Sequence, residues 1–226
     1  MVRGVYLLAG PTASGKSAIA ATLARRLGAR ILSADSMLVY KGMDIGTAKP
    51  SPDEIAEFGM GGVDLVTPAE EFSSGAWLRA ASEWAKTVPE DVPVVVVGGT
   101  GLYFSALLRG LDRRWVDPPP EYPVIRIDRA LVRERIRARL DGMFMAGLED
   151  EKRRLRAKYP VWSRTASLAI GYRDGDDAAK ILVRTCQLAK RQDTWFRHQA
   201  TPIYVEPDAE SVWATWRARG PWPVAL

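Results

Sequence analysis

A glycine-rich stretch, GPTASGKS at residues 10–17, carries the residue types best suited to chemistry. It fits the pattern G-x-x-x-x-G-K-[ST], in which backbone N–H groups close around phosphate oxygens when the stretch joins a strand to a helix. Lys16 brings a full positive charge to the terminal phosphate, and Ser17 is a candidate ligand for Mg²⁺, the expected cofactor. The residues expected to bind phosphate groups are Gly10, Thr12, Ala13, Ser14, Gly15, Lys16 and Ser17.

The phosphate loop alone leaves the reaction open. Such loops most often hold nucleoside triphosphates, which favours a kinase or an ATPase. An ATPase of this class needs a strand that ends in a carboxylate, but the apolar strand expected at residues 92–99 runs into GGTG. A small-molecule kinase usually carries an arginine-rich lid, and only RRLRAK at residues 153–158 could serve as one. An ATP-dependent kinase therefore stays as an alternative.

The elements that must position the loop alternate between strand and helix. Apolar runs predict strands at residues 5–10, 30–35, 92–99, 123–128 and 202–206. Helical spacing predicts helices at residues 16–28, 77–85, 102–108, 129–146, 148–158 and 176–197. This alternation predicts an α/β fold, with a parallel sheet covered by helices on both faces as in P-loop NTPases.

Composition predicts one globular domain over residues 1–226, since 47% of them are hydrophobic. No apolar run approaches the ~20 residues of a membrane span, and no leader is apparent, so we expect a cytoplasmic protein without a membrane partner. The single cysteine, Cys186, excludes an internal disulfide and fits a buried helix position. The net charge of +5 suits anionic ligands, although the basic runs at 129–139 and 152–158 are typical of solvated helix faces.

One segment interrupts the alternation. DRRWVDPPPEYP, at residues 112–123, contains four prolines, which exclude a helix or a central strand. We expect an extended connector that crosses the surface of the domain.

Five further segments resemble tRNA dimethylallyltransferases, in the same order along most of the chain. They are SADSMLVYKGMDIGTAKPS (33–51), VVGGTGLYFSALLRGL (96–111), DRALVRERIRARLDGMFMAGLEDE (128–151), AIGYRD (169–174) and AKRQDTWFR (189–197). The resemblance implies a prenyltransferase whose loop holds dimethylallyl diphosphate rather than ATP. Pyrophosphate would leave, and the family's acceptor is the N6 amine of adenine.

The resemblance also implies catalytic roles for Asp35, Thr100 and Lys16. Asp35 would take the proton of the attacking amine, although sequence alone allows a simple turn cap. Thr100 would lie between diphosphate and acceptor, although it could instead cap the following helix. Arg173 is expected as a further diphosphate contact. The expected acceptor-binding residues are Ser36, Leu38, Thr47, Gly99 and Tyr103.

Three departures from the family affect the acceptor side. The family reads D-S-x-Q-[VI]-Y, whereas this chain has Met37 and Leu38 in DSMLVY. A family histidine pair is absent near GMGGVDLV at 59–66, and the helical insertion that grips the anticodon stem-loop is reduced to the proline-rich connector. These losses favour a small acceptor such as an adenine nucleotide or nucleoside. A compact enzyme acting on tRNA is the alternative, because the basic helices suit RNA.

The remaining candidates have simpler interpretations. The tryptophans Trp115, Trp162 and Trp195 would suit a flat apolar acceptor, but packing in the core or on the surface accounts for each one singly. His198 is the only histidine and is expected on the surface. Without a cluster of histidine and cysteine, a zinc site is not expected.

Overall fold

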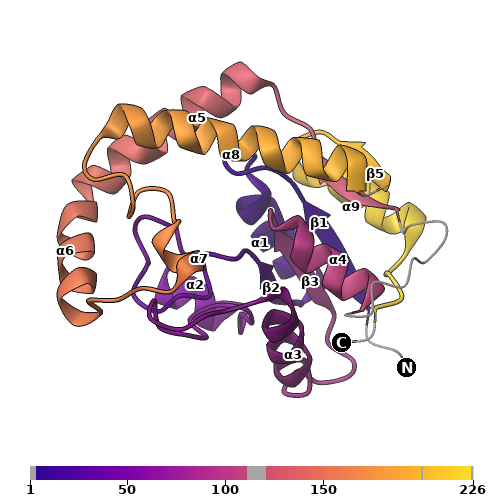
Figure 1. Cartoon of the computed structure of the whole chain (residues 1–226). Helices are drawn as coiled ribbons and strands as arrows, with labels where there is room; N and C mark the ends of the chain where they lie inside the picture. Colours follow the sequence, from indigo (N-terminus) through magenta and orange to yellow (C-terminus); the bar gives the residue numbers. More distant parts are fainter. Residues whose placement is uncertain (1–3, 111–120, 200, 225) are drawn as a thin grey trace.

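The computed structural model describes residues 4–110, 121–199, 201–224 and 226. In this part of the chain, five parallel strands form one sheet in the order β2-β3-β1-β4-β5 (Figure 1). The strands are β1 (Val5–Ala9), β2 (Arg30–Ala34), β3 (Val94–Gly98), β4 (Glu121–Ile125) and β5 (Thr201–Val205). Every residue of β3 is buried, as expected for an apolar strand with both faces covered.

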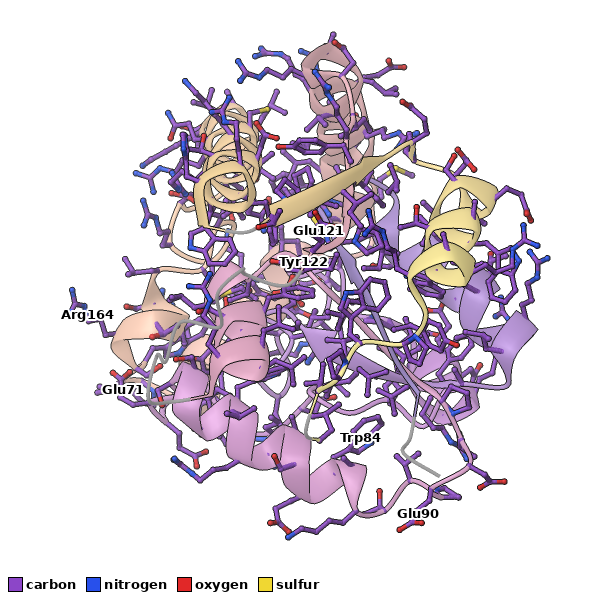
Figure 2. The ribbon with its side chains drawn as sticks, turned by 90° about the vertical axis from the view of Figure 1, so that its right-hand side faces the viewer. Glu71, Trp84, Glu90, Glu121, Tyr122 and Arg164 are labelled. Atoms are coloured by element: carbon purple, nitrogen blue, oxygen red, sulfur yellow. The ribbon has the colours of Figure 1, made fainter. Side chains whose placement is uncertain are left out.

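Helices cover both faces of the sheet, so the predicted fold class is confirmed. They are α1 (Lys16–Leu27), α2 (Pro52–Glu57), α3 (Ser74–Ala85), α4 (Gly101–Arg109), α5 (Arg129–Met145), α6 (Leu148–Lys158), α7 (Arg164–Ser167), α8 (Ala178–Gln199) and α9 (Ala209–Arg219). Figure 2 shows α1 and α9 on one side of the sheet, with α3 and α4 on the other. Helix α1 ends at Leu27, and the following Gly28 caps it in the left-handed conformation with a φ of 63°.

Two buried tryptophans attach these helical layers to the sheet. The indole N–H of Trp77 on α3 donates to the Ser33 carbonyl at 2.9 Å. From the opposite layer, the indole of Trp216 on α9 donates to the Leu7 carbonyl at 2.9 Å. Because both rings are buried and their polar atoms are satisfied, each contributes apolar area without an unpaired donor. The helix predicted at residues 77–85 is thereby confirmed as part of α3.

The proline-rich connector differs partly from expectation. Residues 111–120, which include Trp115, lie outside the described residues, but residues 121–123 open β4, between β1 and β5. The prediction that prolines exclude a central strand is therefore wrong for Pro123. The strand tolerates it because β4 registers with β1 at one position only, Ala9 with Val124, so few hydrogen bonds are lost.

A second apolar cluster joins α5 to α8, which run side by side in Figure 1. It consists of Val132, Ile136 and Ala189, and Cys186 packs against it as a partly buried helix residue. Among the residues that the structure describes, no helix has the length and apolar character to cross a membrane. These two helices, with α6, complete the walls of the site described next.

Candidate active site

The phosphate loop joins β1 to α1 in the context that its motif requires. Gly15 and, unusually for a residue with a Cβ, Ala13 adopt positive φ values of 90° and 62°. The Lys16 ammonium folds back and donates to the Pro11 carbonyl at 3.3 Å, while Ser17 is exposed in the first turn of α1. The Ser14 hydroxyl is buried and has no hydrogen-bond partner within the described residues. The loop thus has the wound backbone of an anion-binding nest.

A cavity of about 530 Å³ lies beside this loop. Segments that are distant in sequence form its walls: the loop, the ends of β2 and β3, the turn at 46–47, and helices α5 and α8. The predicted site residues that line it are Thr12, Asp35, Ser36, Thr47, Gly99, Thr100 and Arg173. The structure therefore brings together most of the predicted catalytic and acceptor-binding residues.

Two predicted acceptor-binding residues lie elsewhere. Tyr103 is only 4% exposed and stacks on Trp77 with ring centroids 4.5 Å apart, because α4 directs it into the core. Burial, with a smaller effect of the Asp35 charge, raises the pKa of its hydroxyl. Leu38 is partly buried and is absent from the described lining of the cavity, which its neighbour Met37 joins instead. Leu38 and Tyr103 therefore do not line this cavity, and their assignment to the acceptor stays a prediction.

Asp35 follows β2 and lines the cavity while also stabilising a turn. One carboxylate oxygen accepts from the Met37 N–H at 2.9 Å, so the turn-cap interpretation is correct as well. In the described part of the chain, its other oxygen has no hydrogen bond. Burial lowers the pKa of Lys16, the Asp35 charge opposes this shift, and the positive charge of Arg139 adds to it. The carboxylate, amine and guanidinium are thus close enough to influence one another.

Thr100 occupies the first position before α4 but does not cap it with its side chain. Its hydroxyl accepts from the Ser36 N–H at 2.9 Å and lies 3.3 Å from the Ser36 hydroxyl, to which it donates. The residue therefore connects the ends of β2 and β3, and its hydroxyl lies beside the carboxylate-bearing turn. The helix-cap interpretation is wrong for the side chain.

Gln192 on α8 is a site residue that sequence reasoning missed. Its side-chain oxygen accepts from the Thr12 N–H at 2.8 Å, and its side-chain nitrogen donates to the Gly99 carbonyl at 3.0 Å. A Cβ at Gly99 would lie 2.4 Å from that nitrogen, and one at Gly101 would lie 2.2 Å from the Trp195 ring. Gly99 and Gly101 thus permit α8 to pack closely against the turn that follows β3.

Two arginines of the basic run on α5 also reach the loop. Arg135 donates to the Ser14 carbonyl at 3.3 Å, and Arg139 donates to the Thr12 hydroxyl at 3.0 Å. The expectation that this run is only a solvated face is wrong for these two residues, because helical spacing places both on the side of α5 that meets the loop. A spacing of four residues between them was the signal available in the sequence.

Further cations line the cavity wall contributed by residues 171–191. Arg184 pairs with the buried carboxylate of Asp174, and Arg173 lies 3.6 Å from the same carboxylate. Arg191 lines the cavity without an ion pair or hydrogen bond to any described residue. With Arg139, these side chains give the cavity an excess of positive charge over Asp35, the single carboxylate among the described residues that line it. The site is therefore built for an anionic ligand.

The tryptophans and the histidine considered in the sequence analysis lie in different places. Trp162 is buried with its ring centroid 5.8 Å from that of Tyr172, and His198 is exposed, as expected. Trp195 lines the cavity. No group of three or more histidine, cysteine, aspartate or glutamate side chains in the described ranges could hold a metal ion.

Comparison with known proteins places this site in a family. Residues 38–126 and 117–199 match the family described as IPP transferase, and residues 3–59 match isopentenyl transferase. The chain belongs to the IPP transferase family. It is therefore a prenyl transferase, as its resemblance to tRNA dimethylallyltransferases implied, and family membership decides against the kinase alternative.

Individual relatives of this IPP transferase differ in how much they align. A tRNA dimethylallyltransferase of Thioalkalivibrio sulfidiphilus is 33% identical over 274 positions, covering 84% of this chain and 86% of the relative. One from Phenylobacterium zucineum is 53% identical over 108 residues, which are 47% of this chain but 35% of that protein. The solved full-length tRNA isopentenylpyrophosphate transferase of Bacillus halodurans has a TM-score of 0.78 at 24% identity, covering 96% and 95% of the two chains, which supports the fold.

The alignment lengths also concern the helical insertion that we expect to be reduced to the proline-rich connector in this chain. The 274 aligned positions exceed the 226 residues of this chain, so the Thioalkalivibrio protein carries residues that this chain lacks. The family match is moreover divided into two parts that meet at residues 117–126, around the proline-rich connector. The replacement of a family insertion by the connector stays a prediction.

Proposed function

We propose that this chain transfers a dimethylallyl group from dimethylallyl diphosphate to the exocyclic amine of an adenine in a tRNA, releasing pyrophosphate. The observation that carries the proposal is the meeting of Asp35, Thr100 and the phosphate loop in one cationic cavity of about 530 Å³. The tRNA acceptor replaces the expected small acceptor, because a relative aligned over most of both chains is named for tRNA.

On the donor side, positive groups assist departure of the diphosphate. The allylic C–O bond breaks, and the electron pair leaves with the diphosphate oxygen, so negative charge grows beside Lys16 and Arg139. A unit charge 4 Å away is worth about 4 kcal/mol at an effective dielectric constant near 20. Loop N–H groups and Arg173 add to this stabilisation, which is aimed at charge that develops in the transition state.

Magnesium fits this donor site as a cofactor bound through oxygen. Since the described residues offer no carboxylate cluster, the protein ligand would be the exposed Ser17 hydroxyl, with diphosphate oxygens supplying others. When bound, the ion would neutralise the diphosphate as a Lewis acid. Ser17 next to Lys16 suits this arrangement, because hydroxyl and phosphate oxygens are the ligands that Mg²⁺ prefers.

On the acceptor side, the adenine amine attacks the allylic carbon and then loses a proton. Asp35 accepts that proton through the carboxylate oxygen that is not engaged with Met37. Thr100 fixes the turn that carries Asp35 and presents its hydroxyl at the same wall. Apolar side chains from α5, including Ile136, Leu140 and Met143, line the cavity and would keep water from the allylic group.

A small adenine compound is the second candidate acceptor. It is favoured by the division of the family match into two parts at residues 117–126, and by the additional residues that a relative carries in its alignment with this chain. A shorter chain has less surface with which to extract a base from a stacked loop, a step that costs a few kcal/mol. The two candidate functions share the donor chemistry and differ only in the acceptor that binds in the cavity.

The test presents both acceptors to the same preparation. The protein is incubated with dimethylallyl diphosphate and Mg²⁺ together with unmodified tRNA, AMP or adenosine, and products are identified by mass spectrometry. The proposal predicts a tRNA product heavier by one dimethylallyl group, with an apparent affinity that falls steeply with salt. Transfer to AMP or adenosine without transfer to tRNA would establish the second candidate, and the absence of any prenylated product would refute both.

A further inference from the structure

Glu151 on α6 is a buried carboxylate that the reaction does not use. It is 4% exposed and forms no ion pair within the described residues. Its oxygens instead accept from three consecutive backbone N–H groups, of Asp44 at 3.1 Å, Ile45 at 2.8 Å and Gly46 at 3.2 Å. The Tyr172 hydroxyl also donates to it. A buried charge without a cation is costly unless hydrogen bonds satisfy it, so these four donors stabilise the anion together.

The turn held by Glu151 forms a wall of the reaction cavity. Gly46 and Thr47 line that cavity together with Asp35 and Thr100. The turn belongs to neither a helix nor a strand, so its position depends on contacts made by its backbone. Lys49 fixes its other end, because its ammonium donates to the Tyr40 carbonyl and to the Asp44 carboxylate, both at 2.7 Å.

Tyr172 completes the attachment of the turn to α6. Its hydroxyl accepts from the Gly46 N–H at 3.2 Å and donates to Glu151. Burial, followed by the hydrogen bond and charge of Glu151, raises the pKa of this hydroxyl, which keeps it protonated as a donor. A Cβ at Gly46 would lie 2.5 Å from the Tyr172 ring, so the turn can approach only because Gly46 lacks a side chain.

From this geometry we propose that Glu151 is a positioning residue for the acceptor. It holds the turn at residues 44–47, and through it Thr47, at the distance from Asp35 that the acceptor base requires. The donor contacts belong to the phosphate loop, α5, α8 and Arg173, none of which hydrogen-bonds to Glu151 in the described structure. Arg173 follows Tyr172 in the chain, so we expect Glu151 to affect acceptor binding far more than donor binding. The identity of the acceptor rests on the proposed function.

Glu151→Gln is the direct test, because it keeps the size of the side chain and removes its charge. The new NH₂ group must face at least two N–H donors of the turn, since each carboxylate oxygen accepts from two or more groups. We expect the KM for tRNA to rise at least tenfold and the Kd for dimethylallyl diphosphate to change less than twofold. Glu151→Asp, which retains the anion, should recover part of the affinity.

Two control variants separate an effect on the position of the turn from a general loss of stability. Glu149→Gln, on an exposed carboxylate of the same helix, should leave both constants unchanged. Tyr172→Phe removes one donor and should raise the KM for tRNA two- to fivefold, which keeps the inference testable if Glu151→Gln does not fold. Hydrogen exchange should show faster exchange of the Asp44–Gly46 amides in Glu151→Gln than in the wild type.

The outcomes distinguish this inference from the proposed function. Faster exchange with an unchanged KM for tRNA, or equal losses of donor and acceptor affinity, would overturn the positioning role. If the wild-type protein modifies no tRNA, the proposed function fails instead. The same variants are then compared with whichever adenine compound is prenylated, and an unchanged KM for that compound would again overturn the inference.

Discussion

Replacing Gln192 with methionine should detach the phosphate loop from the turn after β3. Methionine matches glutamine in length but cannot accept from the Thr12 N–H or donate to the Gly99 carbonyl, 2.8 Å and 3.0 Å from the present side-chain atoms. Two lost hydrogen bonds cost about 0.5–1.5 kcal/mol each, and a buried Gly99 carbonyl left without a donor adds about 1–3 kcal/mol. The free energy of unfolding should fall by about 2–6 kcal/mol.

Two measurements check this prediction for Gln192→Met. Thermal unfolding should shift downward by about 2–4 °C for each kcal/mol lost, given the size of the chain. Calorimetric titration should show weaker binding of dimethylallyl diphosphate, because Gln192 no longer holds the loop at Thr12. Lys190→Met is the control on the same helix, since Lys190 is exposed, does not line the cavity and makes no hydrogen bond in the described structure. If both variants unfold at the same temperature and bind the donor equally, Gln192 does not secure the loop.

Three further outcomes follow from the same site. Lys16→Ala should weaken binding of dimethylallyl diphosphate at least tenfold in calorimetry, and unchanged affinity would remove Lys16 from the donor site. Burial lowers the pKa of Lys16, so the affinity for dimethylallyl diphosphate should decline with rising pH before an ordinary lysine titrates near 10.5. Lys16→Arg should keep its affinity over that range. If the wild type and Lys16→Arg lose affinity in parallel as the pH rises, this assignment is contradicted. Gly101→Ala should destabilise the protein by more than 1 kcal/mol in urea unfolding, since a Cβ would lie 2.2 Å from the Trp195 ring; an unchanged midpoint would show that α8 can move away.

The part of the site at the strand ends could be predicted from the sequence. The motif predicted the phosphate loop, and the family resemblance implied Asp35 and Thr100. All three follow strand ends, which parallel strands bring to one edge of the sheet. The strands and most helices were likewise predicted by apolar spacing. The rule that prolines exclude a central strand was wrong for Pro123, because residue types do not show how many positions of a strand are paired with each neighbour.

Residues that act across long sequence separations were not predictable. Gln192 contacts Thr12 across 180 positions, and Arg139 contacts the same residue across 127, so only the packing of α5 and α8 reveals them. Leu38 and Tyr103 lie next to cavity-lining residues in sequence but do not line the cavity themselves, and Tyr103 is buried in the core. Burial of Glu151, in a strongly charged helix, also contradicted its surroundings in the sequence.

The role of Asp35 as proton acceptor is tested most directly by Asp35→Asn in single-turnover experiments with saturating dimethylallyl diphosphate and tRNA. Asparagine keeps an oxygen that can accept from the Met37 N–H but cannot take up the proton of the amine. We predict that the rate of prenyl transfer falls by about 10²–10⁴-fold while the Kd for dimethylallyl diphosphate stays within twofold of the wild type. Transfer at the wild-type rate, or loss of donor binding instead of transfer, would contradict the account.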